Sequence, residues 1–240
     1  MPERAGRIRL LTKVRALFWL VAILCAAADL LSKYVIFDSF ATRHPAVARR
    51  AERRRAEAAE QLRLHAFELG RLRLAELAGQ GRLDEFADRA DDAGLEPLAD
   101  AARQAGRMAP DYPPVVLIPG FLHIVYGRNY GGVFGLGQGA GLVWLAFGVV
   151  AGGLVVWFAY RDDTRPPTLQ VALGLVMAGA VGNVYDRVVF GYVRDFIEVY
   201  YWPGKAWPAF NIADAGICVG AAYLALYALL FAPRKKTGKG

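Results

Sequence analysis

The chain has 240 residues, of which 55% are hydrophobic, and its formal net charge is +7. This length suits one sizeable domain, with or without an insertion. The basic residues cluster near the two ends and in one segment that is also rich in acids, which argues against a nucleic-acid-binding protein. Cys25 and Cys218 lie inside apolar runs and the three histidines are far apart, so neither a disulfide framework nor a zinc site is expected. We expect no metal ion and no cofactor.

Four stretches of the chain are long and apolar enough to cross a lipid bilayer as a helix, which takes about 20 residues. They are Ala16–Phe37, Ala140–Tyr160, Thr168–Tyr185 and Ile212–Ala232. The first stretch has an alternative interpretation as a cleaved signal peptide, because a basic region precedes it and three alanines lie at residues 26–28. Its apolar character continues beyond Asp29, which a signal peptide does not need, and this favours a spanning helix.

Positively charged flanks indicate how the chain crosses the membrane. The basic residues outside the first and last spans are Arg4, Arg7, Arg9, Lys13, Arg15, Arg234, Lys235, Lys236 and Lys239. Positive flanks stay in the cytoplasm, and four spans return the chain to its starting side, so both termini are expected to be cytoplasmic. The loops at 38–139 and 186–211 then face outward, and the loop Arg161–Pro167 faces the cytoplasm. Long loops are translocated regardless of charge, so the arginines of the first outer loop do not overturn this prediction.

A charged segment separates the first span from the others. We therefore divide the chain into residues 1–42, 43–110 and 111–240. The middle part is rich in alanine, arginine, glutamate and leucine, and Leu62, Leu69 and Leu72 recur at helical spacing, which predicts two or three amphipathic helices. Such helices suit the membrane surface, the outer domain or an unidentified partner, and a solvated insertion without chemistry is the simpler alternative. Beyond it, Val115–Ile118 and Phe121–Val125 flank a Pro-Gly turn and predict a small outer β-sheet.

Ionisable residues within spanning segments are costly, so each one is a functional candidate. Asp29 and Lys33 lie four residues apart on one helix face, which allows either an internal ion pair or a lysine that binds a substrate phosphate or carbonyl. A glycine-rich stretch follows Asn129. It lacks the Gly-Lys-Ser/Thr of a phosphate-binding loop, and it suits either a backbone that approaches a substrate closely or merely a flexible turn.

Further polar residues lie where the third span ends and the fourth begins. They are Asn183, Asp186, Arg187, Asn211 and Asp214. Residues three and four apart share a helix face, so we expect the first three to form one hydrogen-bonded cluster. Asn211 also suits a helix N-cap. Asp214 is harder to assign to a structural role, because an ionised carboxylate in the first turn of a spanning helix needs a partner.

Two carboxylates close together in a poorly solvated site share one proton. The charged one can then act as general base on a water molecule, and the protonated one can polarise a scissile carbonyl. The aspartates available for such a pair are Asp186, Asp195 and Asp214, and no Ser–His or Cys–His arrangement competes for this role. The pattern itself leaves open which two aspartates react.

Five segments together resemble the lipoprotein signal peptidase family, also called type II signal peptidases. They are Asp29-Leu30-Leu31-Ser32-Lys33, Asn129-Tyr130-Gly131-Gly132-Val133-Phe134, Gly182-Asn183-Val184-Tyr185-Asp186-Arg187, Gly191-Tyr192-Val193-Arg194-Asp195-Phe196-Ile197 and Phe210-Asn211-Ile212-Ala213-Asp214. The resemblance implies an α-helical membrane protein with four transmembrane helices and a small extracytoplasmic β-sheet, to which this chain adds a helical insertion. It also implies an aspartic endopeptidase of the bacterial inner membrane with its active site at the extracytoplasmic face. Such an enzyme removes the signal peptide from diacylglyceryl-modified prolipoproteins within membrane lipid, cleaving just before the lipidated cysteine.

The resemblance also implies roles for individual residues. Asp195 and Asp214 would be the catalytic pair, which makes Asp186 a structural acid paired with Arg187. The supporting and substrate-binding residues would be Asp29, Lys33, Asn129, Gly132, Asn183, Asp186, Arg187 and Asn211. Gly132 stands where the family often has alanine, and we expect it to add backbone freedom without loss of chemistry. The insertion at 43–110 is the larger departure, and it is expected to restrict or recruit substrates.

Two other classes of protein use intramembrane acids. A proton-coupled carrier would place its acids near the membrane midplane at corresponding positions of two repeated halves, whereas here they lie at outer ends and no internal repeat is visible. A magnesium-dependent enzyme acting on lipid head groups would use the aspartates as metal ligands and would lose its activity on chelation. Both stay as alternatives to the peptidase hypothesis.

Overall fold

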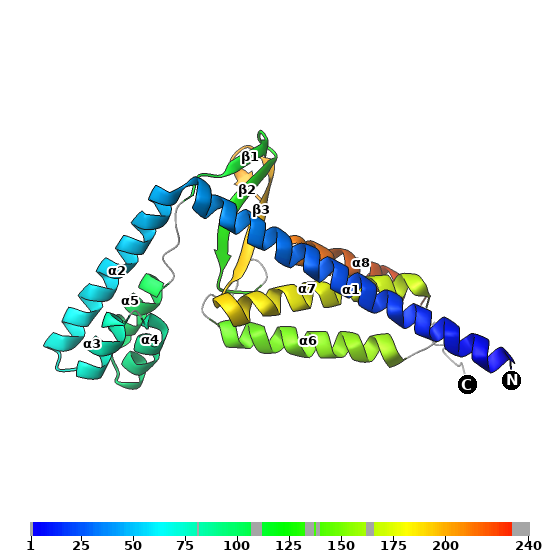
Figure 1. The fold of residues 1–240 in the computed structure, drawn as a ribbon, viewed down its shortest axis with the longest axis horizontal. Coiled ribbons are helices and arrows are strands. Elements are labelled where there is room, and N and C mark those ends of the chain that lie inside the picture. Colours follow the sequence, from blue (N-terminus) through cyan, green and yellow to red (C-terminus); the bar gives the residue numbers. More distant parts are fainter. Residues whose placement is uncertain are drawn as a thin grey trace, which may run out of the picture. The chain divides into compact units, whose positions relative to one another are not determined.

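The computed structural model describes residues 2–80, 82–106, 112–132, 137, 140–161 and 166–231. It divides into two compact units, one of Met1–Phe37 with Pro114–Gly240 and one of Asp38–Pro113. The elements along the chain are α1 (Pro2–Arg43), α2 (Pro45–Glu68), α3 (Leu72–Gly79), α4 (Leu83–Asp92), α5 (Glu96–Gly106), β1 (Val115–Ile118), β2 (Leu122–Asn129), α6 (Gly141–Arg161), α7 (Pro167–Phe190), β3 (Val193–Trp202), β4 (Lys205–Ala206) and α8 (Ile212–Phe231) (Figure 1). Val133, Phe134, the basic residues after Phe231 and the end of the predicted insertion at 107–110 lie outside the described residues.

Among the residues that the structure describes, four helices are long and apolar enough to cross a membrane, which confirms the predicted spans. They are α1 from Lys13 onward, α6, α7 and α8. The third span is longer than predicted, because α7 continues to Phe190 and ends at Gly191, whose φ of 75° provides a left-handed C-cap. As a result Asp186 and Arg187 lie on regular helix, one turn before its end.

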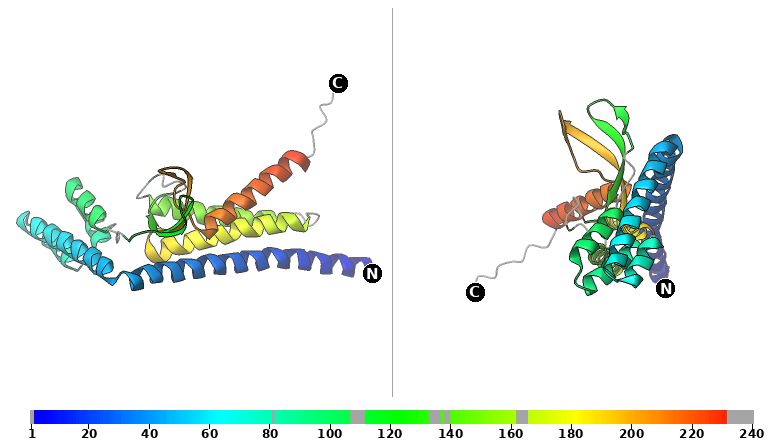
Figure 2. Two further views of the ribbon diagram at one scale, coloured as in Figure 1. Left: turned by 90° about the horizontal axis from the view of Figure 1, so that it is seen from above. Right: turned by 90° about the vertical axis from the view of Figure 1, so that its left-hand side faces the viewer.

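Close approach of α7 and α8 depends on glycine. A Cβ atom at Gly179 would overlap the side chain of Ile217 and lie 2.5 Å from the carbonyl oxygen of Ala213. Small residues at such crossings let two helix backbones pack tightly in a membrane. Helix α1 runs beside α7 (Figures 1 and 2), with Phe18 and Val21 against Gly174. Further along α7, Gly182 lies against both Asp29 of α1 and Ala213 in the first turn of α8.

The small sheet has the strand order β1-β2-β3-β4, and all its pairs are antiparallel. Strand β1 matches its prediction, and the turn that follows contains Gly120 with a φ of 69°. Strand β2 begins one residue later than predicted and extends to Asn129, four residues beyond the predicted end. In its register with β3, Gly127 lies opposite Asp195. The sheet therefore carries Asn129 and Asp195 on adjacent strands.

The second unit has four helices, α2 to α5, so the prediction of two or three helices was wrong. Gly70 and Gly94, with φ of 68° and 70°, follow α2 and α4 and allow the reversals that L-residues rarely adopt. The break at Gly70 was missed because leucines continue on both sides of it. The helices share one buried core of alanine and leucine side chains with Phe86, which is completely buried.

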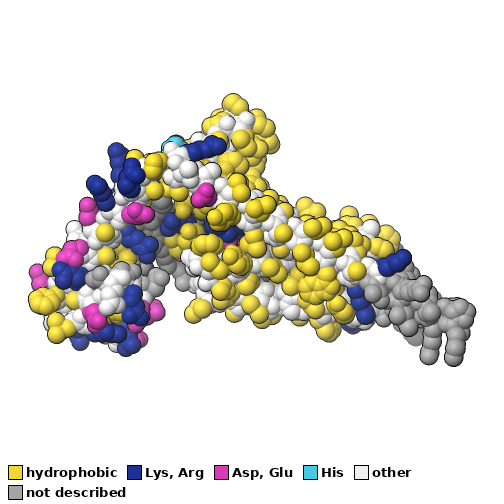
Figure 3. All heavy atoms as spheres, in the orientation of Figure 1, with side chains coloured by type: hydrophobic (Ala, Val, Ile, Leu, Met, Phe, Trp, Pro, Cys, Tyr) yellow, Lys and Arg dark blue, Asp and Glu magenta, His cyan; other side chains and the backbone are white. Residues whose placement is uncertain are grey.

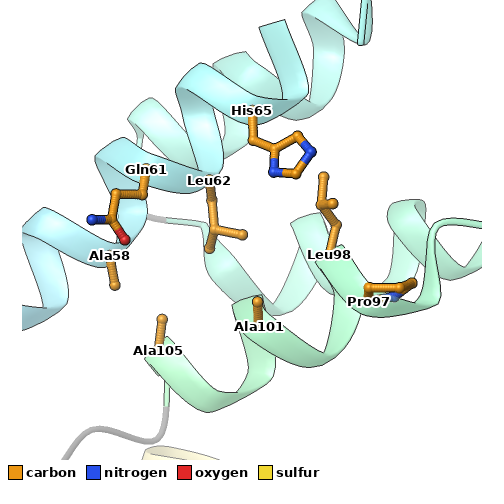
Figure 4. Close-up of a pocket in the computed structure, with 8 residues that line it drawn as sticks. All are labelled: Ala58, Gln61, Leu62, His65, Pro97, Leu98, Ala101 and Ala105. Atoms are coloured by element: carbon orange, nitrogen blue, oxygen red, sulfur yellow. The ribbon is translucent and has the colours of Figure 1, made fainter. Parts of the chain in front are cut away.

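A shallow hollow of about 350 Å³ lies between α2 and α5 (Figure 4). Its lining residues are Ala58, Gln61, Leu62, His65, Pro97, Leu98, Ala101 and Ala105. Two of them are strongly polar and none is an acid. The hollow therefore lacks the paired carboxylates on which the catalytic hypothesis depends.

Candidate active site

Polar side chains from α1, α7, β3 and α8 meet in the first unit, together with the residues that follow β2. Four of them, Asp29, Lys33, Asp186 and Asn211, are completely buried. Burial of charge is favourable only where partners are present. The ten residues that the sequence singled out form one connected network of hydrogen bonds and ion pairs, which the following paragraphs describe from the two central carboxylates outward.

Asp195 and Asp214 are linked through Asn211, which contacts both carboxylates. The Nδ2 group of Asn211 donates a hydrogen bond to Oδ1 of Asp195 at 2.8 Å, while the backbone N–H of Asn211 donates to Oδ2 of Asp214 at 3.2 Å. The Nδ2 group of Asn183 donates to Oδ1 of Asp214 at 2.8 Å. Asn211 also accepts from the backbone N–H of Asp214 at 3.0 Å, which is the predicted N-cap. One asparagine thus touches both carboxylates.

Asp29 and Lys33 form an internal ion pair, which was one of the two predicted alternatives. The Lys33 ammonium lies 2.7 Å from Asp29 and 3.2 Å from Asp186, and it donates to Oδ1 of Asn183 at 3.3 Å. The second oxygen of Asp29 accepts from the backbone N–H of Ala213 at 2.9 Å. The ammonium therefore has three partners from α1 and α7 and is completely buried. Its visible role is to hold these helices together and to orient Asn183.

The predicted pairing of Asp186 with Arg187 was wrong. Asp186 accepts three hydrogen bonds from Arg194, one from the backbone N–H at 2.9 Å and two from the guanidinium at 3.1 and 2.7 Å. Adjacent residues on a helix point about 100° apart, so Asp186 and Arg187 face different partners. The guanidinium of Arg187 instead donates to the carbonyl oxygens of Asn183 at 3.2 Å and Gly131 at 2.8 Å.

Arg194 is the residue of this network that sequence reasoning missed. It is 5% exposed and directly precedes Asp195 on β3. Two guanidinium nitrogens of Arg194 donate to Oδ1 of Asp186 and the backbone N–H donates to Oδ2, so both carboxylate oxygens are bound and this end of β3 is fixed to α7. A count of the buried charges could have indicated this residue. Two acids, Asp29 and Asp186, share the single amine of Lys33, so a second cation is needed nearby.

Asn129 shapes the turn after β2. Its Oδ1 accepts from the backbone N–H of Gly131 at 2.9 Å, and its Nδ2 donates to the carbonyl oxygen of Gly132 at 3.2 Å. A Cβ at Gly132 would overlap the indole ring of Trp144 on α6. The role of Gly132 is therefore to leave room for Trp144, which corrects the expectation of mere backbone freedom.

The pKa of Asp195 is raised from 3.8 to about 7, mainly by burial and secondly by the neighbouring charge of Asp214. Hydrogen bonds from Asn129 and Asn211 favour the ionised form and oppose this shift. Asp195 is 4% exposed, whereas Asp214 is half-buried. The pair is thus asymmetric, and the first proton that it retains near neutral pH belongs on Asp195. In the part of the chain that the structure describes, no group of three or more His, Cys, Asp or Glu is arranged to hold a metal ion.

The fold and the site define a polytopic membrane protein with an aspartic site at one end of its spans. The family model of signal peptidase (SPase) II matches residues 100–230. The chain is 38% identical over 123 residues to a lipoprotein signal peptidase of Symbiobacterium thermophilum, with 51% of this chain and 80% of that protein covered. It is 44% identical over 135 residues to a lipoprotein signal peptidase of Pseudomonas syringae pv. tomato, with 53% and 75% covered.

A solved bacterial membrane enzyme is 31% identical, with 53% of this chain and 77% of that chain covered and a TM-score of 0.47. From the family match and its curated relatives, the chain belongs to the signal peptidase II family, a family of aspartic-type membrane proteases. The resemblance seen in the five sequence segments is confirmed.

Proposed function

We propose that this protein removes the signal peptide from diacylglyceryl-modified prolipoproteins and cuts the peptide bond just before the lipidated cysteine. In this proposal Asp195 and Asp214 activate one water molecule. The observation that carries it is the contact of Asn211 with both carboxylates, which holds two acids together in a poorly solvated site. Such pairs share a proton and perform general acid–base chemistry near neutral pH.

The charges of the network support a shared proton. Its acids are Asp29, Asp186, Asp195 and Asp214, and its bases are Lys33, Arg187 and Arg194. Four carboxylates against three cations leave one negative charge in excess when every group is ionised. A single proton on the catalytic pair makes the network neutral, which is the state that a low-dielectric surrounding favours.

The different burial of the two carboxylates supports a different role for each. Asp214, half-buried, acts as the general base that takes a proton from water, and the resulting oxygen nucleophile attacks the scissile carbonyl carbon. Asp195, protonated, donates to the carbonyl oxygen as the tetrahedral intermediate forms. The proton on Asp214 then passes to the departing amide nitrogen, the C–N bond breaks, and one hydroxyl proton of the intermediate returns to Asp195 as the carbonyl re-forms. The products are a signal peptide with a new C-terminal carboxyl group and a lipidated cysteine with a free amine.

An apolar hollow of about 480 Å³ lies beside the later part of β3 and Phe210. It is lined by Val199, Tyr201, Trp207 and Phe210. Val199 and Tyr201 follow Asp195 at even spacing along β3, so the three side chains lie on one face of the strand. Phe210 directly precedes Asn211. An apolar stretch of signal peptide placed in this hollow would therefore lead to the two carboxylates, and the acyl chains of the substrate would stay in the membrane.

We also propose that both termini face the cytoplasm and that the site faces the extracytoplasmic side. This rests on the basic residues before the first span and after the last one, together with the even number of spans. It fits the substrate, because a secreted precursor presents its cleavage site on that side.

The test is cleavage of a purified diacylglyceryl-modified prolipoprotein by wild type, Asp195→Asn, Asp214→Asn and a matched control, Asp92→Asn, each with and without EDTA. Asp92 is an exposed acid of the second unit. We expect both site variants to lose at least a thousandfold in rate, and the wild type and control to cleave equally in EDTA. Retained cleavage by Asp195→Asn would refute the dyad.

Loss of wild-type activity in EDTA would instead favour the magnesium enzyme, and a wild type that never cleaves would reopen the carrier hypothesis. A separate comparison with a substrate that lacks the diacylglyceryl group tests the substrate class. Equal rates on both substrates would contradict the proposed requirement for lipid modification.

A further inference from the structure

The second unit is nearly neutral as a whole, but its charges are segregated along the chain. Residues 43–55 contain six arginines and one glutamate, for a net charge of +5. Residues 56–107 contain seven arginines and 11 acids, for a net charge of −4. The basic part comprises the last residue of α1 and the first half of α2, and Figure 3 shows basic side chains gathered over that part of α2.

The two sets of arginines differ in their partners. In the acidic part, Arg63, Arg73, Arg82 and Arg103 form ion pairs with Glu60, Glu76, Glu85, Asp91 and Asp100. In the basic part, all six side chains are exposed, and the residues that the structure describes offer none of them an ion-pair partner within 4.0 Å. The basic residues are Arg43, Arg49, Arg50, Arg53, Arg54 and Arg55.

This arrangement is unfavourable for an isolated helix. Arg49 and Arg53 lie four residues apart, as do Arg50 and Arg54, and like charges at this spacing repel each other on a helix surface. The first turn of α2 carries no acid to offset them. An external surface with negative charge would relieve the repulsion, and nothing in the packing of the second unit requires arginine at these exposed positions.

We propose that the first half of α2 binds the anionic head groups of membrane lipids. Only His44 separates α2 from α1, whose apolar part is a candidate span, so the six arginines lie within 12 residues of the end of that span. Clusters of four to eight basic residues next to a spanning helix attract acidic lipids, and the attraction decreases within a Debye length. The inference is independent of the proposed cleavage and of which membrane face carries the second unit.

A lipid fits better than a second copy of this chain. The acidic helices that a second copy would offer already use five of their 11 acids in local ion pairs. Anionic lipid, by contrast, is a continuous surface that is present wherever the chain leaves the membrane. An array of exposed guanidinium groups along two turns of helix suits several phosphates of such a surface rather than one isolated anion.

The experiment uses the full-length protein in lipid nanodiscs of pure phosphatidylcholine or with 30% phosphatidylglycerol, followed by amide hydrogen exchange of residues 46–58. The basic-cluster variant changes Arg49, Arg50, Arg53 and Arg54 to Gln, which keeps the helix propensity. The matched control changes Arg63, Arg71, Arg73 and Arg89 to Gln and removes the same charge from the same unit. Exposed ion pairs contribute little, so the control is expected to stay folded.

We expect phosphatidylglycerol to slow the exchange of this segment about tenfold in the wild type and in the control, and less than twofold in the basic-cluster variant. The effect should decrease in 0.5 M salt. Equal exchange in both lipid mixtures, or undiminished protection of the basic-cluster variant, would overturn the proposal. The proposal would also be overturned if soluble glycerophosphate protected the segment equally well. It would likewise be overturned if the segment were protected in pure phosphatidylcholine discs, but only in those that hold two copies of the protein. Exchange of α7 reports whether each variant is folded.

Discussion

Replacement of Asp195 by asparagine tests the electrostatics of the site without reference to catalysis. The pKa of the carboxyl is about 7 in the folded protein against 3.8 in a solvated reference. Because the folded state disfavours ionisation, Asp195 costs stability once the unfolded chain can ionise and the folded one cannot. The cost is absent below pH 3.8, grows as the pH rises, and reaches its full value above pH 7. The difference between the two pKa values corresponds to a loss of about 4 kcal/mol in the free energy of unfolding.

Asparagine has nearly the same shape and still accepts the hydrogen bond from Asn211, but it never ionises. We therefore expect Asp195→Asn and wild type to unfold at similar temperatures near pH 4. By pH 8 the variant should be more stable by about 4 kcal/mol, which is about 10 °C for a chain of this size. The assay is thermal unfolding of both proteins in detergent micelles, measured at half-unit intervals from pH 4 to 9.

The control is Asp214→Asn. Since the charge of Asp214 is the second cause of the raised pKa of Asp195, its removal should lower that pKa, so that the destabilisation by Asp195 is smaller and reaches its full value at a lower pH. A stability difference between Asp195→Asn and wild type that stays constant from pH 4 to pH 8 would refute the raised pKa and, with it, the assignment of the shared proton.

Three further predictions follow from the same contacts. Cleavage by wild type should decline above pH 7, as Asp195 loses the proton that it donates, and a rate that still rises at pH 9 would contradict the assigned roles. Gly132→Ala should destabilise the protein by about 2 kcal/mol through overlap with Trp144, and Trp144→Leu should restore most of that loss in thermal unfolding. Arg194→Gln should cost about 3 kcal/mol, because Asp186 loses the guanidinium and keeps Lys33 as its charged partner together with the backbone N–H of residue 194. Adding Asp186→Asn to this variant should not add a second full loss.

The sequence was sufficient for features set by local periodicity. The four spans follow from apolar length, and the ion pair of Asp29 with Lys33 follows from their spacing of four residues on one helix. The first two strands of the sheet follow from two apolar runs around a Pro-Gly turn, whereas β3 and β4 were not predicted as strands. The ends of helices were harder to predict. The leucine pattern continues across Gly70, where α2 has ended, and the apolar pattern stops five residues before the end of α7.

Partners that are distant in the chain were beyond local reasoning. The guanidinium of Arg194 reaches Asp186 only because β3 folds back along the end of α7, and the neighbouring Arg187 seemed the simpler partner in sequence. Similarly, the indole of Trp144 occupies the space beside Gly132 through packing of α6, which no spacing rule predicts. Residue identities were therefore predictable more often than the contacts through which they act.

The insertion leaves the site intact because the first unit holds α1 by contacts of its own. Asp29 binds the first turn of α8 through the backbone N–H of Ala213, and Lys33 binds Asp186 on α7. One turn further, the ring of Phe37 packs at 4.2 Å from that of Tyr126 on β2. The three residues of α1 that make these contacts precede Asp38, where the second unit begins. The second unit buries an apolar core of its own. A segment that brings its own core and replaces none of these contacts can be inserted without altering the geometry of the carboxylates.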